Sequence, residues 1–232
     1  MTSFEDRPDR FFPLQEEDAI LLADSWRRLA GEGYEARAAG EELLGRWSES
    51  HRRYHTVSHL WSTLRAVDVL QEEARDPDAV RYAVWFHDAV YEGRPGRDED
   101  ESAALAERLL ALMGKEPGLI AEVVRLVGVT KNHRPERWDA NGAVVSDADL
   151  STLAGPADEY LAYTAAVRAE YWHMADKVFR AGRLQVLRSL LEAPHLFHTP
   201  FGRAHWEPRA RSNILAEVDR LTQEVPEELP PP

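Results

Sequence analysis

The sequence predicts an all-α protein that folds as a single helical bundle. Alanine, leucine, glutamate and arginine, which are good helix formers, dominate the 232 residues, and strand-like alternation of β-branched residues is almost absent. We find no internal repeat and no stretch with the composition of a domain linker. We therefore expect one all-helical domain over residues 1–224 and a disordered tail, rich in proline and glutamate, over 225–232.

In the first half of the chain, apolar residues recur at helical spacing and turn residues separate the segments. Asp76 followed by Pro77 favours a helix start, because the carboxylate can cap the first turn and proline fits the first helical position. A turn is predicted over 93–96, and Gly114 and Pro117 separate the two helices that follow it. The predicted helices cover about 15–30, 34–47, 54–70, from 77 through 87, 100–112 and 117–130.

The second half of the chain begins with a polar segment, 131–142, which predicts a loop. The short apolar segment 144–150 follows it and contains Asp147 and Asp149. Gly155 and Pro156 predict the start of a long helix that continues to about residue 175. Two further helices are expected over 183–191 and 206–221.

Composition limits the classes of function. The formal net charge of −13 disfavours a nucleic-acid-binding surface, because phosphate backbones require basic stripes. The chain has no cysteine, which excludes disulfides, thiolate metal sites and cysteine nucleophiles. No apolar run reaches the roughly 18 residues of a membrane span, and no signal peptide pattern is found. We expect a cytoplasmic protein without membrane contact, with the oligomeric state left open, a homodimer included.

The pair His87-Asp88 is the most informative feature of the chain. It interrupts the apolar run 82–91, where a buried helix would favour leucine or alanine. Burying an imidazole and a carboxylate without partners is costly. A structural hydrogen bond between them is one explanation. A bound cation is the other, because it uses the carboxylate charge and the imidazole nitrogen together.

Two further clusters supply the same kinds of ligand. His55 and His59 are four residues apart, so on a helix they share a face. Asp147 and Asp149 lie in the short apolar segment already described. Two imidazoles and two carboxylates suit a divalent metal ion such as manganese, magnesium, iron, zinc or nickel. The residues alone leave open which member of each pair would bind it.

The ordered set of a histidine, His-Asp and a distal aspartate resembles the HD superfamily of metal-dependent phosphohydrolases. The match is closest to an uncharacterised bacterial group of predicted HD-superfamily phosphohydrolases, and it extends from about residue 47 to 221. This resemblance implies a helical bundle of the HD-domain type. The segments that carry it are RYHTVSH at 53–59, WFHDAVY at 85–91, DESA at 100–103, SDADLS at 146–151, RAEY at 168–171 and RARSN at 209–213.

Similarity to cyclic-nucleotide phosphodiesterases, distant relatives by fold, implies the ligand assignment. In their Tyr-His-Asn-x-x-His segment the second histidine binds metal and the first protonates the leaving group. The same spacing here, with Thr56 in place of asparagine, implies that His59 is a ligand and His55 a general acid. Their Ala-Asp-Leu-Ser segment matches residues 148–151, which favours Asp149 over Asp147. The implied ligands are His59, His87, Asp88 and Asp149.

Other candidates lie near these motifs. Some HD proteins have a histidine at the position of His133, where it contacts a second metal ion or the phosphate. Glu101 is a candidate for the same region or for a water-activating base, although it also fits a solvated acidic helix start. Arg53 and Lys131 are candidate phosphate contacts, and Lys131 could also assist the leaving group. Asp147 is expected beside the ligands without binding the metal.

The resemblance implies hydrolysis of a small phosphorylated substrate, with a nucleotide as the default, by attack of a metal-activated water. Asp88 would then be both ligand and catalytic residue. The alternatives are a sensor module that binds a metal and a nucleotide without turnover, and a bundle in which the metal is structural. Glu170 and the group Arg209, Arg211 and Asn213 fit salt bridges and helix caps better than catalysis.

Overall fold

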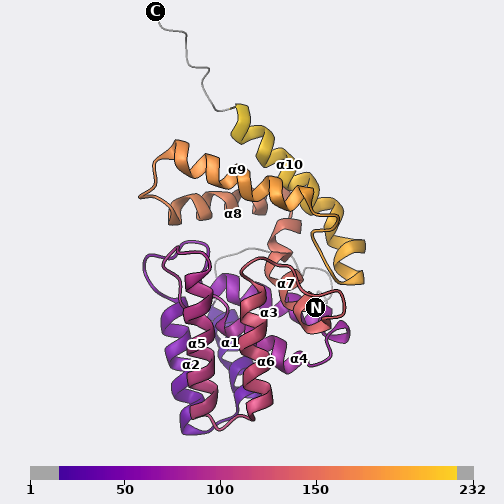
Figure 1. The fold of residues 1–232 in the computed structure, drawn as a ribbon. Coiled ribbons are helices and arrows are strands. Elements are labelled where there is room, and N and C mark those ends of the chain that lie inside the picture. The colour runs from indigo at the N-terminus through magenta and orange to yellow at the C-terminus, as the bar shows by residue number, and fades with distance from the viewer. Residues whose placement is uncertain (1–15, 224–232) are drawn as a thin grey trace, which may run out of the picture.

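The computed structural model describes residues 16–223, and over that range the chain is helical with no strand (Figure 1). The predicted all-α class is therefore confirmed for these residues. The helices are α1 (Glu16–Ala30), α2 (Tyr34–Trp47), α3 (Val57–Leu70), α4 (Pro77–Phe86), α5 (Arg97–Leu112), α6 (Pro117–Val129), α7 (Ala140–Leu150), α8 (Ala157–Glu170), α9 (Asp176–Glu192) and α10 (Glu207–Gln223). Short turns of other helix types are η2 (Gln71–Glu73), η3 (Ser151–Ala154) and η4 (Gly202–Trp206).

Helix α4 lies at the centre of the bundle formed by the first seven helices. Every residue from Ala79 to Phe86 except Arg81 is buried, and the helix packs against α1, α3, α5, α6 and α7. Asp76 accepts a hydrogen bond from the backbone N–H of Ala79 (3.0 Å) and Pro77 occupies the first turn, as predicted. Because α4 ends at Phe86, His87 and Asp88 stand at the buried end of the central helix.

The last three helices form a second layer, which Figure 1 shows across one end of the first bundle. Asn213 of α10 joins them to η3, because its side-chain amide donates to the carbonyls of Leu153 and Gly155 (both 2.9 Å). Within the layer, Arg183 of α9 pairs with the buried carboxylate of Glu217 at 2.8 Å. This layer covers the end of the bundle at which α4 stops.

Several boundaries differ from the expected ones. The helix expected from 156 to about 175 is shorter, since α8 ends at Glu170, and the helix expected over 183–191 begins earlier, at Asp176 of α9. Arg168 donates to the carbonyls of Tyr171 (2.8 Å) and Met174 (3.2 Å), which satisfies groups that a continuing helix would have used. Helix α5 begins at Arg97 instead of residue 100, and α7 begins at Ala140, inside the expected loop.

The tail predicted over 225–232 lies outside the described residues. Within them, no helix is both long and apolar enough to cross a membrane.

Candidate metal centre

The ends of three helices bring His59, His87 and Asp149 together. His59 lies in the first turns of α3, His87 directly follows α4, and Asp149 is near the end of α7. The Nε2 atoms of the two histidines are 3.3 Å apart. Asp149 Oδ1 lies 3.1 Å from Nε2 of His59 and 3.5 Å from Nε2 of His87. These three residues could hold a metal ion.

Asp88 completes the set of four implied ligands. Its Oδ2 atom lies 3.2 Å from Nε2 of His87 and 3.9 Å from Nε2 of His59. Ligand atoms about 2.1 Å from a common ion lie about 3.0–3.4 Å from each other in octahedral or tetrahedral geometry. The separations among His59, His87 and Asp149 are close to this range, so these three donors fit a divalent cation, whereas the 3.9 Å between Asp88 and His59 lies outside it.

The hydrogen bonds behind the two imidazoles aim Nε2 at this centre. His87 Nδ1 donates to the carbonyl oxygen of Val84 at 2.8 Å, so Nε2 is the nitrogen that faces the centre. His59 Nδ1 faces the hydroxyl of Thr63 at 3.4 Å. The indole ring of Trp47 packs against both imidazoles, with ring centroids at 6.2 Å from His59 and 5.4 Å from His87. The sequence did not identify Trp47 as part of this shell.

The electrostatics of the cluster favour ionised carboxylates. Burial alone would raise the pKa of Asp149, but the charge of His87 and hydrogen bonds from His59 and His87 lower it well below its usual range. The pKa of Asp88 is lowered for a similar reason, against burial, by His87 and His55. Burial lowers the pKa of His59. A cation and a proton would satisfy the same carboxylates, so metal binding competes with protonation here.

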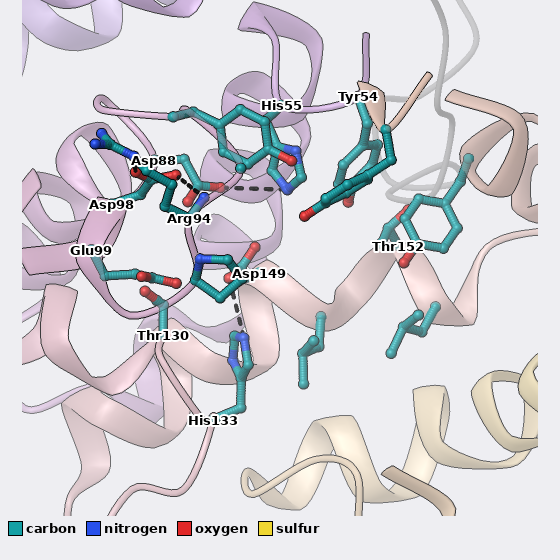
Figure 2. Close-up of a pocket in the computed structure, with 17 residues that line it drawn as sticks. Tyr54, His55, Asp88, Arg94, Asp98, Glu99, Thr130, His133, Asp149 and Thr152 are labelled. Atoms are coloured by element: carbon teal, nitrogen blue, oxygen red, sulfur yellow. Dashed lines mark hydrogen bonds and ion pairs between the residues drawn. The ribbon is translucent and has the colours of Figure 1, made fainter. Parts of the chain in front are cut away.

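His55 precedes α3, and Figure 2 shows its imidazole directed towards Asp88. Its Nδ1 atom is 2.7 Å from Oε2 of Glu170, and its Nε2 atom is 3.8 Å from Oδ2 of Asp88. The ring of Tyr91 stacks on the imidazole, with centroids 4.1 Å apart. Burial disfavours a charged imidazole, but Asp88 and Glu170 outweigh it and raise the pKa of His55.

Glu170 is the residue whose role the sequence reasoning missed. Its Oε1 atom accepts hydrogen bonds from the backbone N–H groups of Arg53 (2.8 Å), Tyr54 (2.8 Å) and His55 (2.9 Å). Its Oε2 atom holds His55 and also accepts from the Tyr91 hydroxyl at 3.0 Å. Burial opposes ionisation, but these bonds lower the pKa of Glu170 to about 2. The segment RAEY, already part of the family resemblance, was the available signal.

His133 approaches the centre from the segment between α6 and α7. Its Nε2 atom is 3.6 Å from Oδ2 of Asp149, the carboxylate oxygen that does not face the other two histidines. Its backbone has φ +52°, in the left-handed region that side chains rarely adopt. Its carbonyl oxygen accepts from Nε2 of His198 at 2.9 Å, which supports this unusual turn.

Asp147 points away from the centre. One carboxylate oxygen accepts from the backbone N–H of His198 (2.7 Å), and the other accepts from the N–H (2.8 Å) and hydroxyl (2.7 Å) of Thr199. Burial outweighs these bonds and raises the pKa of Asp147 to about 6. Asp147 therefore ties α7 to the segment before α10, while Asp149 faces the histidines.

Three candidates from the sequence lie away from the centre and do not line its cavity. Lys131 forms an ion pair with Asp100. The guanidinium of Arg53 donates to the backbone carbonyls of Ser50 (2.5 Å) and Arg52 (2.8 Å). Glu101 pairs with Arg94 at 3.2 Å and Arg97 at 2.8 Å. These contacts account for the three side chains without a ligand.

A cavity of about 220 Å³ opens onto the candidate ligands Asp88 and Asp149 and onto His55 and His133 (Figure 2). Its remaining wall includes Arg94, with Asp98 and Glu99 from the start of α5. Four tyrosines, Tyr54, Tyr91, Tyr163 and Tyr171, also line it. This volume is below the roughly 300–1,000 Å³ typical of ligand pockets, so the enclosed space suits only a small molecule next to the candidate centre.

Comparison of the chain with protein-family models, with curated proteins and with solved structures found no match.

Proposed function

We propose that this protein is a metal-dependent phosphohydrolase with an HD-type helical bundle, and that its substrate is a small phosphorylated molecule. One observation carries the proposal. Two buried imidazoles and the carboxylate of Asp149 come together beside a cavity, Asp88 contacts one of these imidazoles, and His55, held from behind by Glu170, faces Asp88. The arrangement combines a cation site with a positioned proton donor, which phosphoester hydrolysis requires.

His59, His87, Asp88 and Asp149 are the residues that would hold the ion. A divalent ion bound there would polarise a phosphoryl oxygen and lower the pKa of a coordinated water towards about 7. The tautomer of His87, set by its bond to Val84, keeps Nε2 available for this purpose. His133 stands on the far side of Asp149, where it would contact the phosphate or a second ion.

His55 is proposed as the general acid. Because Nδ1 donates to Glu170, Nε2 is the atom that faces the cavity, and its proton would pass to the oxygen of the leaving group. In the overall reaction the bond between phosphorus and that oxygen breaks, and a water oxygen replaces it on phosphorus. Glu170 keeps the imidazole in this orientation and stabilises its charged form, the part that a buried carboxylate plays beside a catalytic histidine.

The experiment is a hydrolysis screen of phosphorylated compounds on purified protein with manganese, magnesium or nickel added. We expect metal-dependent phosphate release that disappears in His87→Ala and Asp88→Asn, while circular dichroism shows the helical fold retained. Asp219→Asn, on the exposed side of α10, makes the same charge change away from the centre and should leave activity unchanged. Activity equal to that of the unmodified protein in both site variants would exclude the assignment.

A binding module is the second candidate, and one observation favours it. Lys131 and Arg53, which would have contacted phosphate, are engaged elsewhere, so the cavity has fewer cations than a typical phosphotransfer site. In this case the protein would bind a metal and a phosphorylated ligand as a sensor, or the metal would only stabilise the bundle. Tight binding of phosphorylated compounds by the metal-loaded protein without phosphate release would select the sensor. Unchanged stability on metal loading would argue against a structural metal.

A further inference from the structure

The wall of the cavity beyond the metal ligands is acidic. Asp98 and Glu99, at the start of α5, line it together with Asp88 and Asp149. Figure 2 shows Asp98, Glu99 and Arg94 grouped on one side of the centre. Apart from the candidate ligands Asp88 and Asp149, the lining therefore contributes two carboxylates and one guanidinium, together with the imidazoles of His55 and His133.

That guanidinium is already engaged by carboxylates. Arg94 Nε lies 3.2 Å from Oδ1 of Asp98, and its Nη2 lies 3.2 Å from Oε2 of Glu101. A second anionic group of a ligand would therefore meet a guanidinium whose charge is already offset by two carboxylates. Binding it there would bring like charges together in a partly enclosed space, where Coulomb repulsion is less screened than in water.

Phenol rings also line the cavity. Tyr54 packs edge-on against Tyr163, with centroids 4.7 Å apart, and Tyr171 lies near Gly93. Burial raises the pKa of both Tyr54 and Tyr171, so these groups stay uncharged at neutral pH. Such a wall suits an aromatic or hydroxyl-bearing organic group.

We infer that the substrate is a phosphomonoester whose only anionic group is the phosphate at the metal centre, and whose leaving group is uncharged. This inference rests on the proposed function, since it assigns the leaving-group side of the same cavity. Nucleoside monophosphates, and phosphomonoesters of uncharged sugars or phenols, are therefore expected to be better substrates than di- and triphosphates. The acidic side chain that most directly tests it is Glu99, which is only partly buried and faces the cavity.

The test uses two matched ligand pairs on the full chain loaded with manganese. The first pair is phenyl phosphate with a para-carboxamide or a para-carboxylate, for which kcat/KM is measured. The second is the corresponding pair of benzylphosphonates, which cannot be hydrolysed and whose Kd is measured by calorimetry. We expect the neutral member to be favoured by about tenfold or more in both measurements, the size of a single unfavourable charge contact.

Two variants assign the preference to the cavity wall. Glu99 accepts a hydrogen bond from the backbone N–H of Gly96 at 2.6 Å, and glutamine can make the same cap. Glu99→Gln therefore removes one negative charge while keeping the start of α5, and it should reduce the preference at least threefold, which is roughly half of the single-contact effect on a free-energy scale. Glu107→Gln makes the same change on the exposed side of α5 and should leave the preference unaltered.

Equal binding and turnover of the charged and neutral members would overturn the inference while leaving the hydrolase proposal intact. So would an identical preference in the Glu99→Gln and Glu107→Gln variants. A preference among the phosphonates without hydrolysis of either phosphate would support the inference about the cavity and overturn the hydrolase. Failure to bind either phosphonate would overturn both.

Discussion

Replacing Glu170 by glutamine tests whether this carboxylate holds the loop before α3 and His55 in place. The pKa of Glu170 falls from an ordinary 4.5 to about 2, because His55 and three backbone N–H groups stabilise the ionised form against burial. At about 1.4 kcal/mol per pKa unit, the ionised carboxylate contributes about 3 kcal/mol to the free energy of unfolding at neutral pH. Glu170→Gln should remove most of this contribution.

The sign of the pH dependence follows from the lowered pKa. The unfolded chain binds the proton more readily than the folded one, so the contribution is complete above about pH 4.5 and is lost as pH falls towards 2. It should be roughly halved near pH 3. The difference between the unmodified protein and Glu170→Gln should therefore be largest at pH 7 and should shrink on acidification.

The assay is urea unfolding followed by circular dichroism at pH 7 and at several values down to pH 3, with Glu107→Gln as the control. A second measurement is metal-dependent phosphatase activity. The amide nitrogen of glutamine would face Nδ1 of His55 and oppose a proton there, so it would disfavour the doubly protonated imidazolium that acts as the acid, and kcat should fall by about 10²–10⁴ with little change in KM. A variant as stable as the unmodified protein at pH 7, or a stability loss independent of pH, would refute this reasoning.

Three other predictions concern the centre and its support. Asp149→Asn should abolish manganese binding in calorimetry, whereas Asp147→Asn, two residues earlier, should leave the affinity within about threefold because Asp147 faces the opposite way. Because the pKa of Asp147 is raised to about 6, the folded protein binds a proton at this carboxyl group more tightly than the unfolded chain does. The stability that this proton contributes is therefore lost as pH rises from about 4 to 6, and thermal unfolding of Asp147→Asn should show a smaller loss over that range. Gly202→Ala should lower the free energy of unfolding by about 2 kcal/mol, since a Cβ there would lie 2.6 Å from Oδ2 of Asp147 and 2.8 Å from Cβ of Phe197; an unchanged urea midpoint would contradict the packing.

The side chains that meet at the candidate centre were visible in the sequence because each signal is local. His87-Asp88 was conspicuous as a polar pair in an apolar run, and α4 proved to be the buried central helix that the run implied. The pairs His55/His59 and Asp147/Asp149 were equally visible, yet their members have different roles. On a helix or in a turn, residues two to four apart point in directions that depend on what packs around them. The resemblance to known motifs, not spacing, indicated which member faces the centre.

Other assignments failed for lack of long-range information. Lys131 and Arg53 looked like phosphate contacts, but their partners, Asp100 and backbone carbonyls, are not evident from residue type. Glu170 looked like a structural residue and is one, since it binds three backbone N–H groups, but it also holds His55 across more than a hundred positions of chain.

The sequence by itself determined the helical class, the helix around His87, most of the turns and the kinds of side chain available for a metal centre. Propensity, capping and hydrophobic periodicity act within a few residues, so the chain carries that information directly. The tertiary structure alone decided that the ends of α3, α4 and α7 meet, that Glu170 of the second layer orients His55, and that the cavity wall is acidic with its one guanidinium already paired. Those features depend on packing between distant helices, which no local pattern specifies.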